Sequence, residues 1–206
     1  MIIEKIQYIS QAAEQGSHLT AIEKVLWDGG KWIQLRVKEK PEEEVLELAV
    51  KASVLCRNYG AKLIINDYPQ VALEVDAYGL HLGLDDMPVP EARAILGYSK
   101  CIGGTANTFS DILRRVAEGV DYIGLGPYRF TTTKKNLSPV LGLAGYRMIL
   151  QQMREAGITT PVIAIGGIEL PDIDLLLSAG VHGIAVSGLL TRSNHLNEEF
   201  YVNYSR

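Results

Sequence analysis

Eight short runs rich in β-branched and aliphatic residues recur along this chain, and longer stretches with helical periodicity separate them. Between residues 41 and 58, for example, Val45, Ala49 and Ala52 recur at the spacing of one helical face. Such alternation predicts repeated strand–helix units and a parallel sheet. Eight units in 206 residues favour an α/β fold closed as a single (β/α)8 TIM barrel with short helices, over an open doubly wound sheet. The eight runs are Ile6–Ser10, Trp32–Lys38, Lys62–Asp67, Tyr78–Leu84, Cys101–Thr105, Asp121–Gly126, Pro161–Gly166 and Gly183–Gly188.

Length and composition agree with one catalytic domain that spans residues 1–206. A hydrophobic content of 47% is enough for one sizeable core. The formal charge of −4, with both signs interspersed, provides no basic face for nucleic acid or for an anionic membrane. No apolar run approaches the roughly 18 residues of a membrane span, and no secretory leader pattern stands at the start. We therefore expect a cytoplasmic protein without a nucleic-acid or membrane partner.

One connection is longer than the others. Pro127–Val140 reads PYRFTTTKKNLSPV and follows the sixth run. Polar connections of more than about ten residues are usually functional or mobile. In a barrel of this kind the connection would lie at the carboxyl-terminal mouth, where active sites are found. It is a candidate lid.

Cations alternate with apolar residues in the second run. Ile33, Leu35 and Val37 share one face, while Gln34, Arg36 and Lys38 share the other. If the apolar face packs under helices, the polar face points into the barrel and toward its mouth, where two buried cations need an anionic partner. A multiply charged phosphate is the favoured partner, and a salt-bridged barrel layer is the alternative.

Carboxylates end the next two runs. Asp67 follows Asn66, and Asp86 follows Asp85, so acidic side chains come from neighbouring loops on the functional face. Mg²⁺ commonly takes one or two carboxylates together with phosphate oxygens and water. Helix capping is the alternative, since a proline follows each group within two residues.

Small residues end the last two runs. Gly166 and Gly167 follow the seventh run, and Ser187 precedes Gly188 in the eighth. Loops at these two positions often bind phosphate in such barrels, although a glycine pair alone is more often a plain turn. His81 alternates with leucines and should face the barrel interior, in either a structural or a catalytic role.

The assembled motifs resemble the thiamine-phosphate synthase family over nearly the whole chain. The matching segments are QLRVK (34–38), INDY (65–68), GLHLGLDDMP (79–88), DYIGLGPYRFTTTKK (121–135) and PVIAIGGI (161–168). The resemblance implies a transferase that joins hydroxymethylpyrimidine pyrophosphate to hydroxyethylthiazole phosphate with Mg²⁺ and releases pyrophosphate.

On the first substrate, the resemblance implies contacts from the second and third runs. Gln34, Arg36, Lys38 and Asn66 match residues that contact the pyrophosphate. The two Mg²⁺ ligands would be Asp67 and Asp86.

On the second substrate, the resemblance implies contacts from the lid and the last two loops. Thr131 and Thr133 match residues that hold the thiazole phosphate, and Lys134 matches one that handles the departing pyrophosphate. Gly167 matches a phosphate-binding glycine, and Val186 and Ser187 match thiazole-phosphate contacts.

The chain departs from the family pattern after the fifth run. Where the family usually has Ser followed two residues later by His, this chain has Thr105 and Asn107. Thr105 keeps a hydroxyl, so we still expect it to contact the pyrophosphate. The eighth run ends Val186-Ser187-Gly188-Leu189 instead of Val-Ser-Ala-Ile and keeps the serine.

The implied mechanism is a dissociative substitution in which Arg36, Lys38, Lys134 and Mg²⁺ neutralise the leaving pyrophosphate. Two alternatives remain. One is a thiazole tautomerase, which depends on a His near the end of the fifth run where this chain has Asn107. The other is a non-catalytic barrel that binds thiazole or thiamine phosphate. Self-association into a homo-oligomer stays open.

Overall fold

Eight parallel strands form a closed barrel. The computed structural model describes residues 1–12, 17–131, 138–192 and 198–204. Each strand pairs with its sequence neighbours, and β8 closes on β1 with Ile6 opposite Ile184 and Tyr8 opposite Val186. The strands are β1 (Ile6–Ile9), β2 (Trp32–Leu35), β3 (Lys62–Asn66), β4 (Gly79–Leu82), β5 (Cys101–Ala106), β6 (Tyr122–Leu125), β7 (Val162–Ile165) and β8 (Gly183–Val186).

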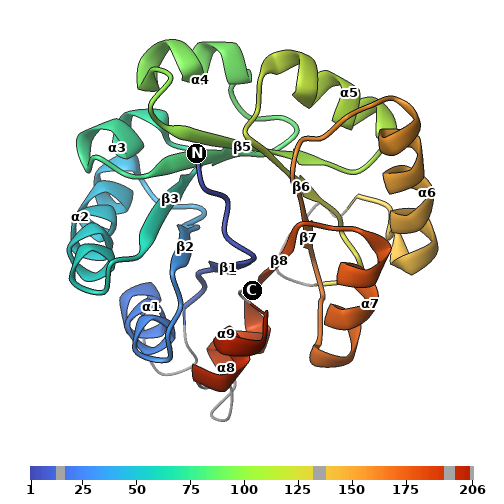
Figure 1. Ribbon diagram of the computed structural model, residues 1–206. Helices are drawn as coiled ribbons and strands as arrows, with labels where there is room; N and C mark the ends of the chain where they lie inside the picture. Colours follow the sequence, from blue (N-terminus) through green and yellow to red (C-terminus); the bar gives the residue numbers. More distant parts are fainter. Residues whose placement is uncertain (13–16, 132–137, 193–197, 205–206) are drawn as a thin grey trace.

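Helices surround the barrel as an outer ring (Figure 1), as expected for a TIM barrel. Most of those described are short, while α2 and α6 have 17 and 14 residues. Local sequence explains several starts, such as the capping box that Thr108 and Asp111 form at α5. The helices are α1 (His18–Trp27), α2 (Glu42–Asn58), α3 (Pro69–Glu74), α4 (Val89–Leu96), α5 (Phe109–Glu118), α6 (Gly142–Glu155), the 3-10 helix η1 (Leu170–Asp172), α7 (Ile173–Ala179), α8 (Gly188–Arg192) and α9 (Glu198–Tyr204).

Two hydrophobic clusters follow from the alternation of side chains along the strands. The larger lies between sheet and helices and contains Ile33, Leu35 and Val37, as the apolar face of the second run predicted. The smaller fills the barrel interior and contains Trp32 and Tyr122. The interior is therefore packed with side chains and is not a pore.

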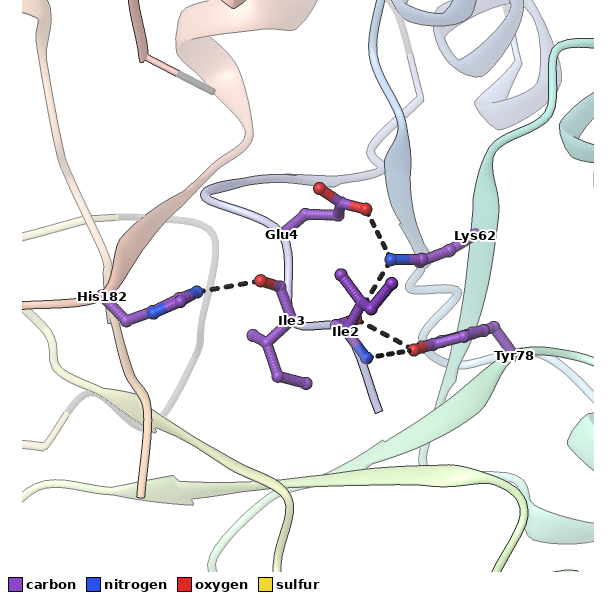
Figure 2. Close-up of polar contacts among 6 residues, drawn as sticks. All are labelled: Ile2, Ile3, Glu4, Lys62, Tyr78 and His182. Carbon is purple, nitrogen blue, oxygen red and sulfur yellow. Dashed lines mark hydrogen bonds and ion pairs between the residues drawn. The ribbon is translucent and has the colours of Figure 1, made fainter. Parts of the chain in front are cut away.

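The amino-terminal face of the barrel is closed by the first residues of the chain, which run across it (Figure 1). Ile3 packs against the interior cluster. Figure 2 shows how its neighbours are fixed: Lys62 Nζ contacts Glu4 Oε1 at 2.5 Å and the Ile2 carbonyl at 3.1 Å. The Tyr78 hydroxyl bonds both the amide and the carbonyl of Ile2, and His182 Nε2 donates to the Ile3 carbonyl at 2.9 Å.

Most strands are shorter than the runs that predicted them, and the difference bears on the site at β2. We expected a strand through Lys38, but β2 ends at Leu35, so Arg36 and Lys38 lie in the loop beyond it. Pairing with β3 stops at Leu35 opposite Ile65, and Glu39 then takes the left-handed conformation with φ of 60°. Both cations thus stand at the mouth. Within the described ranges, no helix is long and apolar enough to cross a membrane.

Candidate active site

Four charged residues meet at the carboxyl ends of β2, β3 and β4. We call Arg36, Lys38, Asp67 and Asp86 the ionic cluster. Lys38 Nζ pairs with Asp67 Oδ2, and the Asp67 and Asp86 carboxyl groups are hydrogen bonded to each other. The charges of both carboxylates also act on Arg36. The structure therefore brings together the four charged residues that the sequence predicted as one site.

Asp67 has an unusual backbone conformation and a raised pKa. Its φ of 69° is rare for a residue other than glycine, and its amide donates to the His81 carbonyl at 3.0 Å. Burial, followed by the hydrogen bond with Asp86, raises the pKa of Asp67 to about 6. Helix α3 begins after Tyr68 without a side-chain cap, so the capping alternative for Asp67 is wrong. Strain of this kind is commonly found at functional sites.

Asp86 is held by the backbone of its own loop. Its Oδ2 accepts a hydrogen bond of 2.6 Å from the Gly83 amide, and a Cβ on Gly83 would come within 2.6 Å of the same oxygen. Burial would raise the pKa of Asp86, but the hydrogen bonds from Asp67 and Gly83 outweigh it and lower the pKa. Asp85 is exposed, and α4 has no side-chain cap. Asp86, and not its neighbour, is therefore the carboxylate that lies against Asp67.

The carboxyl pair fits a hard divalent cation. The Asp67 and Asp86 carboxyl groups lie against each other, and, in addition to burial, the charge of Asp86 raises the pKa of Asp67, so a bound cation would relieve their mutual repulsion. The described part of the chain contains no group of three or more His, Cys, Asp or Glu that could hold a metal. A two-carboxylate site suits Mg²⁺, which completes its shell with phosphate oxygens and water.

Arg36 is fixed by a group that the sequence reasoning missed. Ser10, just past β1, accepts a hydrogen bond from the Arg36 amide at 3.1 Å and lies 2.9 Å from His18 Nδ1. Burial, and then the charge of Arg36, lowers the pKa of His18, so this histidine adds no further positive charge at neutral pH. The only sequence signal was the position of Ser10 at the end of a run.

Two buried polar atoms at the mouth have no hydrogen-bond partner within the described residues. They are Asn66 Nδ2, at the end of β3, and Ser187 Oγ, just beyond β8. An unpaired buried polar group costs free energy, so such groups commonly await a ligand or water. Both residues were predicted to bind substrate.

Other predicted residues have different surroundings. Gln34 is buried in the barrel, where it bonds to Gln7, while Thr105 is partly exposed near the end of β5 and bonds to His81. The Val186 side chain packs in the helix-facing cluster, so only its backbone faces the site. His81 faces the interior, as its alternation with leucines predicted.

Hydrogen bonds join the two ends of the candidate lid, and we call this joined base the neck of the loop. Asn107 Nδ2 donates to the carbonyls of Gly126 and Pro139, both at 2.9 Å. The Leu141 amide donates to the Pro127 carbonyl at 2.9 Å, which joins the two ends of the loop again. The peptide bond between Gly126 and Pro127 is cis.

Thr131 is partly buried and lies at the edge of the described part of this loop. The predicted residues Thr133 and Lys134 fall outside the described residues. Their roles remain predictions.

The glycine pair after β7 supports the base of this loop. Gly166 and Gly167 have φ of 89° and 69°, and a Cβ on Gly167 would lie 3.0 Å from Arg129 and Phe130 atoms. Arg129 donates to the Gly167 carbonyl at 2.9 Å and forms a two-point ion pair with Asp172 at 2.7 and 2.9 Å. Packing against the loop is thus one reason for glycine here, and phosphate binding by Gly167 stays a prediction.

Fold and site together define a class: a (β/α)8-barrel enzyme with paired carboxylates and cations at its mouth. The family model described as Thiamine monophosphate synthase matches residues 6–190. A thiamine-phosphate synthase of Flavobacterium johnsoniae is 50% identical over 206 residues, which cover 97% of each chain. Another, from Bacteroides fragilis, is 50% identical over 94% of this chain and 95% of its own. The solved thiamine phosphate pyrophosphorylase of Pyrococcus furiosus superposes with a TM-score of 0.79 at 30% identity, covering 93% of this chain and 89% of its own.

The chain belongs to the thiamine-phosphate synthase family. It is a transferase of thiamine biosynthesis with the TIM-barrel fold.

Proposed function

We propose that residues 1–206 act as a single catalytic domain that joins hydroxymethylpyrimidine pyrophosphate to hydroxyethylthiazole phosphate and releases pyrophosphate. The ionic cluster is the observation that carries this proposal, because it combines two cations for a polyanion with two carboxylates for a metal. The curated relatives at 50% identity support it. We place the reaction in the cytoplasm, since both substrates carry charged phosphate groups that do not cross membranes unaided.

Asp67 and Asp86 would hold Mg²⁺, as the contact between their two carboxyl groups suggests. When bound, the metal supplies positive charge that neutralises the departing pyrophosphate. Lys38 already lies against Asp67, so its ammonium group is placed to contact an anion bound beside the same carboxylate.

The protein's part in the reaction is electrostatic and positional. The bond between the pyrimidine methylene and the pyrophosphate oxygen breaks with its electron pair leaving on the pyrophosphate. The thiazole nitrogen then forms the new carbon–nitrogen bond with its lone pair. Arg36, Lys38 and Lys134 would stabilise the charge that develops on the leaving group, and stabilisation of this kind commonly accounts for most of the rate enhancement in such enzymes.

The two unpaired polar atoms at the mouth would complete the substrate contacts. Asn66 Nδ2 is a donor suited to a pyrophosphate oxygen, and the Ser187 hydroxyl suits the thiazole phosphate. Gln34, Thr105, Thr131, Thr133, Gly167 and Val186 are the further contacts of this proposal.

The tautomerase alternative is less well supported by the geometry. At the position in question, both hydrogens of the Asn107 side-chain amide are donated to backbone carbonyls. That side chain has a structural task at the neck of the loop, and an amide is no proton-transfer group.

The first test follows thiamine phosphate formation from the two substrates, with Mg²⁺ or with EDTA. We expect product only with Mg²⁺. Asp86→Asn should lower kcat/KM by about 100-fold or more and raise the Mg²⁺ concentration that gives half-maximal rate. Asp85→Asn is the matched control, because this neighbouring carboxylate is exposed, and it should behave as wild type. Equal rates in EDTA, or equal losses in both variants, would contradict the proposal.

A further inference from the structure

Five side chains from five strands form one hydrogen-bonded row inside the barrel, which we call the interior network. Gln34 Nε2 donates to Gln7 Oε1 at 3.0 Å, and Gln7 Nε2 donates to the Tyr122 hydroxyl at 3.3 Å. Tyr122 lies 3.0 Å from His81 Nδ1, and His81 Nε2 lies 3.0 Å from Thr105 Oγ1. Two predicted substrate residues, Gln34 and Thr105, are thus linked across the barrel by Gln7, Tyr122 and His81.

The network has a direction. Because the Tyr122 oxygen accepts the Gln7 amide hydrogen, its own hydroxyl hydrogen is available for His81. If the hydroxyl donates that hydrogen to Nδ1, a neutral His81 carries its ring proton on Nε2. In that tautomer Nε2 donates to Thr105 Oγ1, so the hydroxyl hydrogen of Thr105 points to a different acceptor.

The barrel is built around these rings. A Cβ on Gly103 would come within 2.1 Å of the Tyr122 ring, and a Cβ on Gly124 within 2.9 Å of His81 Cε1. The Trp32 ring packs edge-on against Tyr122 with 5.0 Å between centroids. Glycine inside a strand commonly marks such a close approach. Tyr122 is fully buried, so its hydroxyl has little freedom to choose another partner.

Thr105 is the point where the network reaches the mouth. The other residues of β5 are buried, and Thr105 alone in that strand is partly exposed. Its neighbour in the network, His81, pairs across the sheet with Asn66, next to Asp67 of the ionic cluster. The Thr105 hydroxyl therefore stands between the interior network and the region proposed for the pyrophosphate.

We infer that Tyr122 is a positioning residue for the reaction: through His81 it orients the Thr105 hydroxyl as a hydrogen-bond donor toward the anionic substrate. The inference rests on the proposed function, in which Thr105 contacts the pyrophosphate. A donor that cannot turn toward an internal acceptor loses less freedom when an anion binds.

The kinetic test compares isosteric variants. Tyr122→Phe should raise KM for the pyrimidine pyrophosphate by about tenfold, the size expected for one misdirected hydrogen bond to a charged group. KM for the thiazole phosphate should not change. Tyr78→Phe is the matched control at the opposite end of the barrel, where a hydroxyl is also lost, and both KM values should stay at wild type.

A double-mutant cycle separates positioning from general weakening. In a Thr105→Val background, Tyr122→Phe should cause no further rise in KM, since the two changes remove one interaction. Thr105→Ser should restore both the wild-type KM and the sensitivity to Tyr122→Phe. Additive effects of Tyr122→Phe and Thr105→Val would overturn the inference.

A spectroscopic test does not depend on turnover. Nitrogen-15 NMR of the four histidines should show His81 as the Nε2-protonated tautomer, assigned by its absence in His81→Gln. Tyr122→Phe should abolish that preference. An Nδ1-protonated His81 in the wild-type protein would overturn the inference. An absence of thiamine phosphate formation by the wild type would instead overturn the proposed function. The tautomer of His81 could still be determined in that case.

Discussion

The two ends of the barrel differ in how their charged side chains are paired. At the amino-terminal face, Lys62, Glu4 and Tyr78 are paired with each other or with the first residues of the chain (Figure 2). At the mouth, the carboxyl groups of Asp67 and Asp86 lie against each other, and Asp67 adopts a strained backbone. At the amino-terminal face, the charged groups find their partners within the protein. At the mouth, the charged groups are arranged so that a ligand of the right charge can pair with them.

Replacing a cation at the mouth should test this contrast most directly. Arg36→Ala should lower kcat by about 10²- to 10³-fold, since it removes a charge that faces the leaving group. The far-ultraviolet circular dichroism spectrum should be retained. Steady-state kinetics of thiamine phosphate formation measures the effect, and a near-wild-type kcat would remove Arg36 from the site.

The neck of the candidate lid gives the next effect. Asn107→Asp would place a carboxylate against the carbonyl oxygens of Gly126 and Pro139, where the amide now donates two hydrogen bonds. Repulsion should open the neck, lower kcat/KM by about tenfold and let water capture the pyrimidine.

Chromatography of the products measures this partition. The ratio of hydroxymethylpyrimidine to thiamine phosphate should rise in Asn107→Asp. Asn107→Ala removes the hydrogen bonds without adding a charge and should give a smaller rise. An unchanged ratio in both variants would show that the neck does not control access of water.

The stability of the folded protein should depend on pH through Asp67 at the mouth, and thermal unfolding can measure this dependence. The folded protein holds a proton on Asp67 up to a pKa of about 6, above the ordinary value of 3.8. Without metal, the contribution of Asp67 to stability therefore declines as pH rises from about 4 through 6, because the native state binds more protons than the unfolded state there. Added Mg²⁺ needs the ionised form and should raise Tm by a few degrees at pH 7.5 but less at pH 5.

Asp67→Asn provides the control for this measurement. An amide does not titrate, so the decline between pH 4 and 6 should be reduced and the Mg²⁺ effect at pH 7.5 lost. Equal responses to Mg²⁺ in the variant and the wild type would place the metal elsewhere.

The smallest expected effect is on stability, at the amino-terminal face of the barrel. Lys62→Ala at the amino-terminal face should lower the free energy of unfolding by about 1 kcal/mol through loss of its partly buried contacts with Glu4 and Ile2. Its kcat should equal that of the wild type. Denaturant unfolding and steady-state kinetics on the same sample check both statements, and a fall in kcat would show that the two ends are coupled.

Much of the fold followed from local pattern. Strand runs and helical stretches alternate with little interruption, and side-chain alternation correctly placed Gln34 and His81 inside the barrel. The pairing of Asp67 with Asp86 was also predictable, because neighbouring parallel strands end at the same edge.

Contacts across the barrel were beyond this reasoning. Alternation tells which way Tyr122 points but not that it meets Gln7 or His81 from distant strands. The left-handed backbone of Asp67 has no sequence signal, since residues other than glycine rarely adopt it. The glycines in Cys101–Ala106 and Tyr122–Leu125 were the one available hint of large rings nearby.

The closed neck of the lid has a consequence for how this enzyme can be altered. Hydrogen bonds from Asn107 and Leu141 fix both ends of the loop on the barrel, so the loop is attached as a separable insert. The entropy of closing a flexible loop grows only slowly with its length. Segments of other lengths or sequences grafted between Arg129 and Pro139 should therefore leave the barrel folded. If a lysine equivalent to Lys134 is kept, this loop is the natural place to engineer acceptance of a different nucleophile.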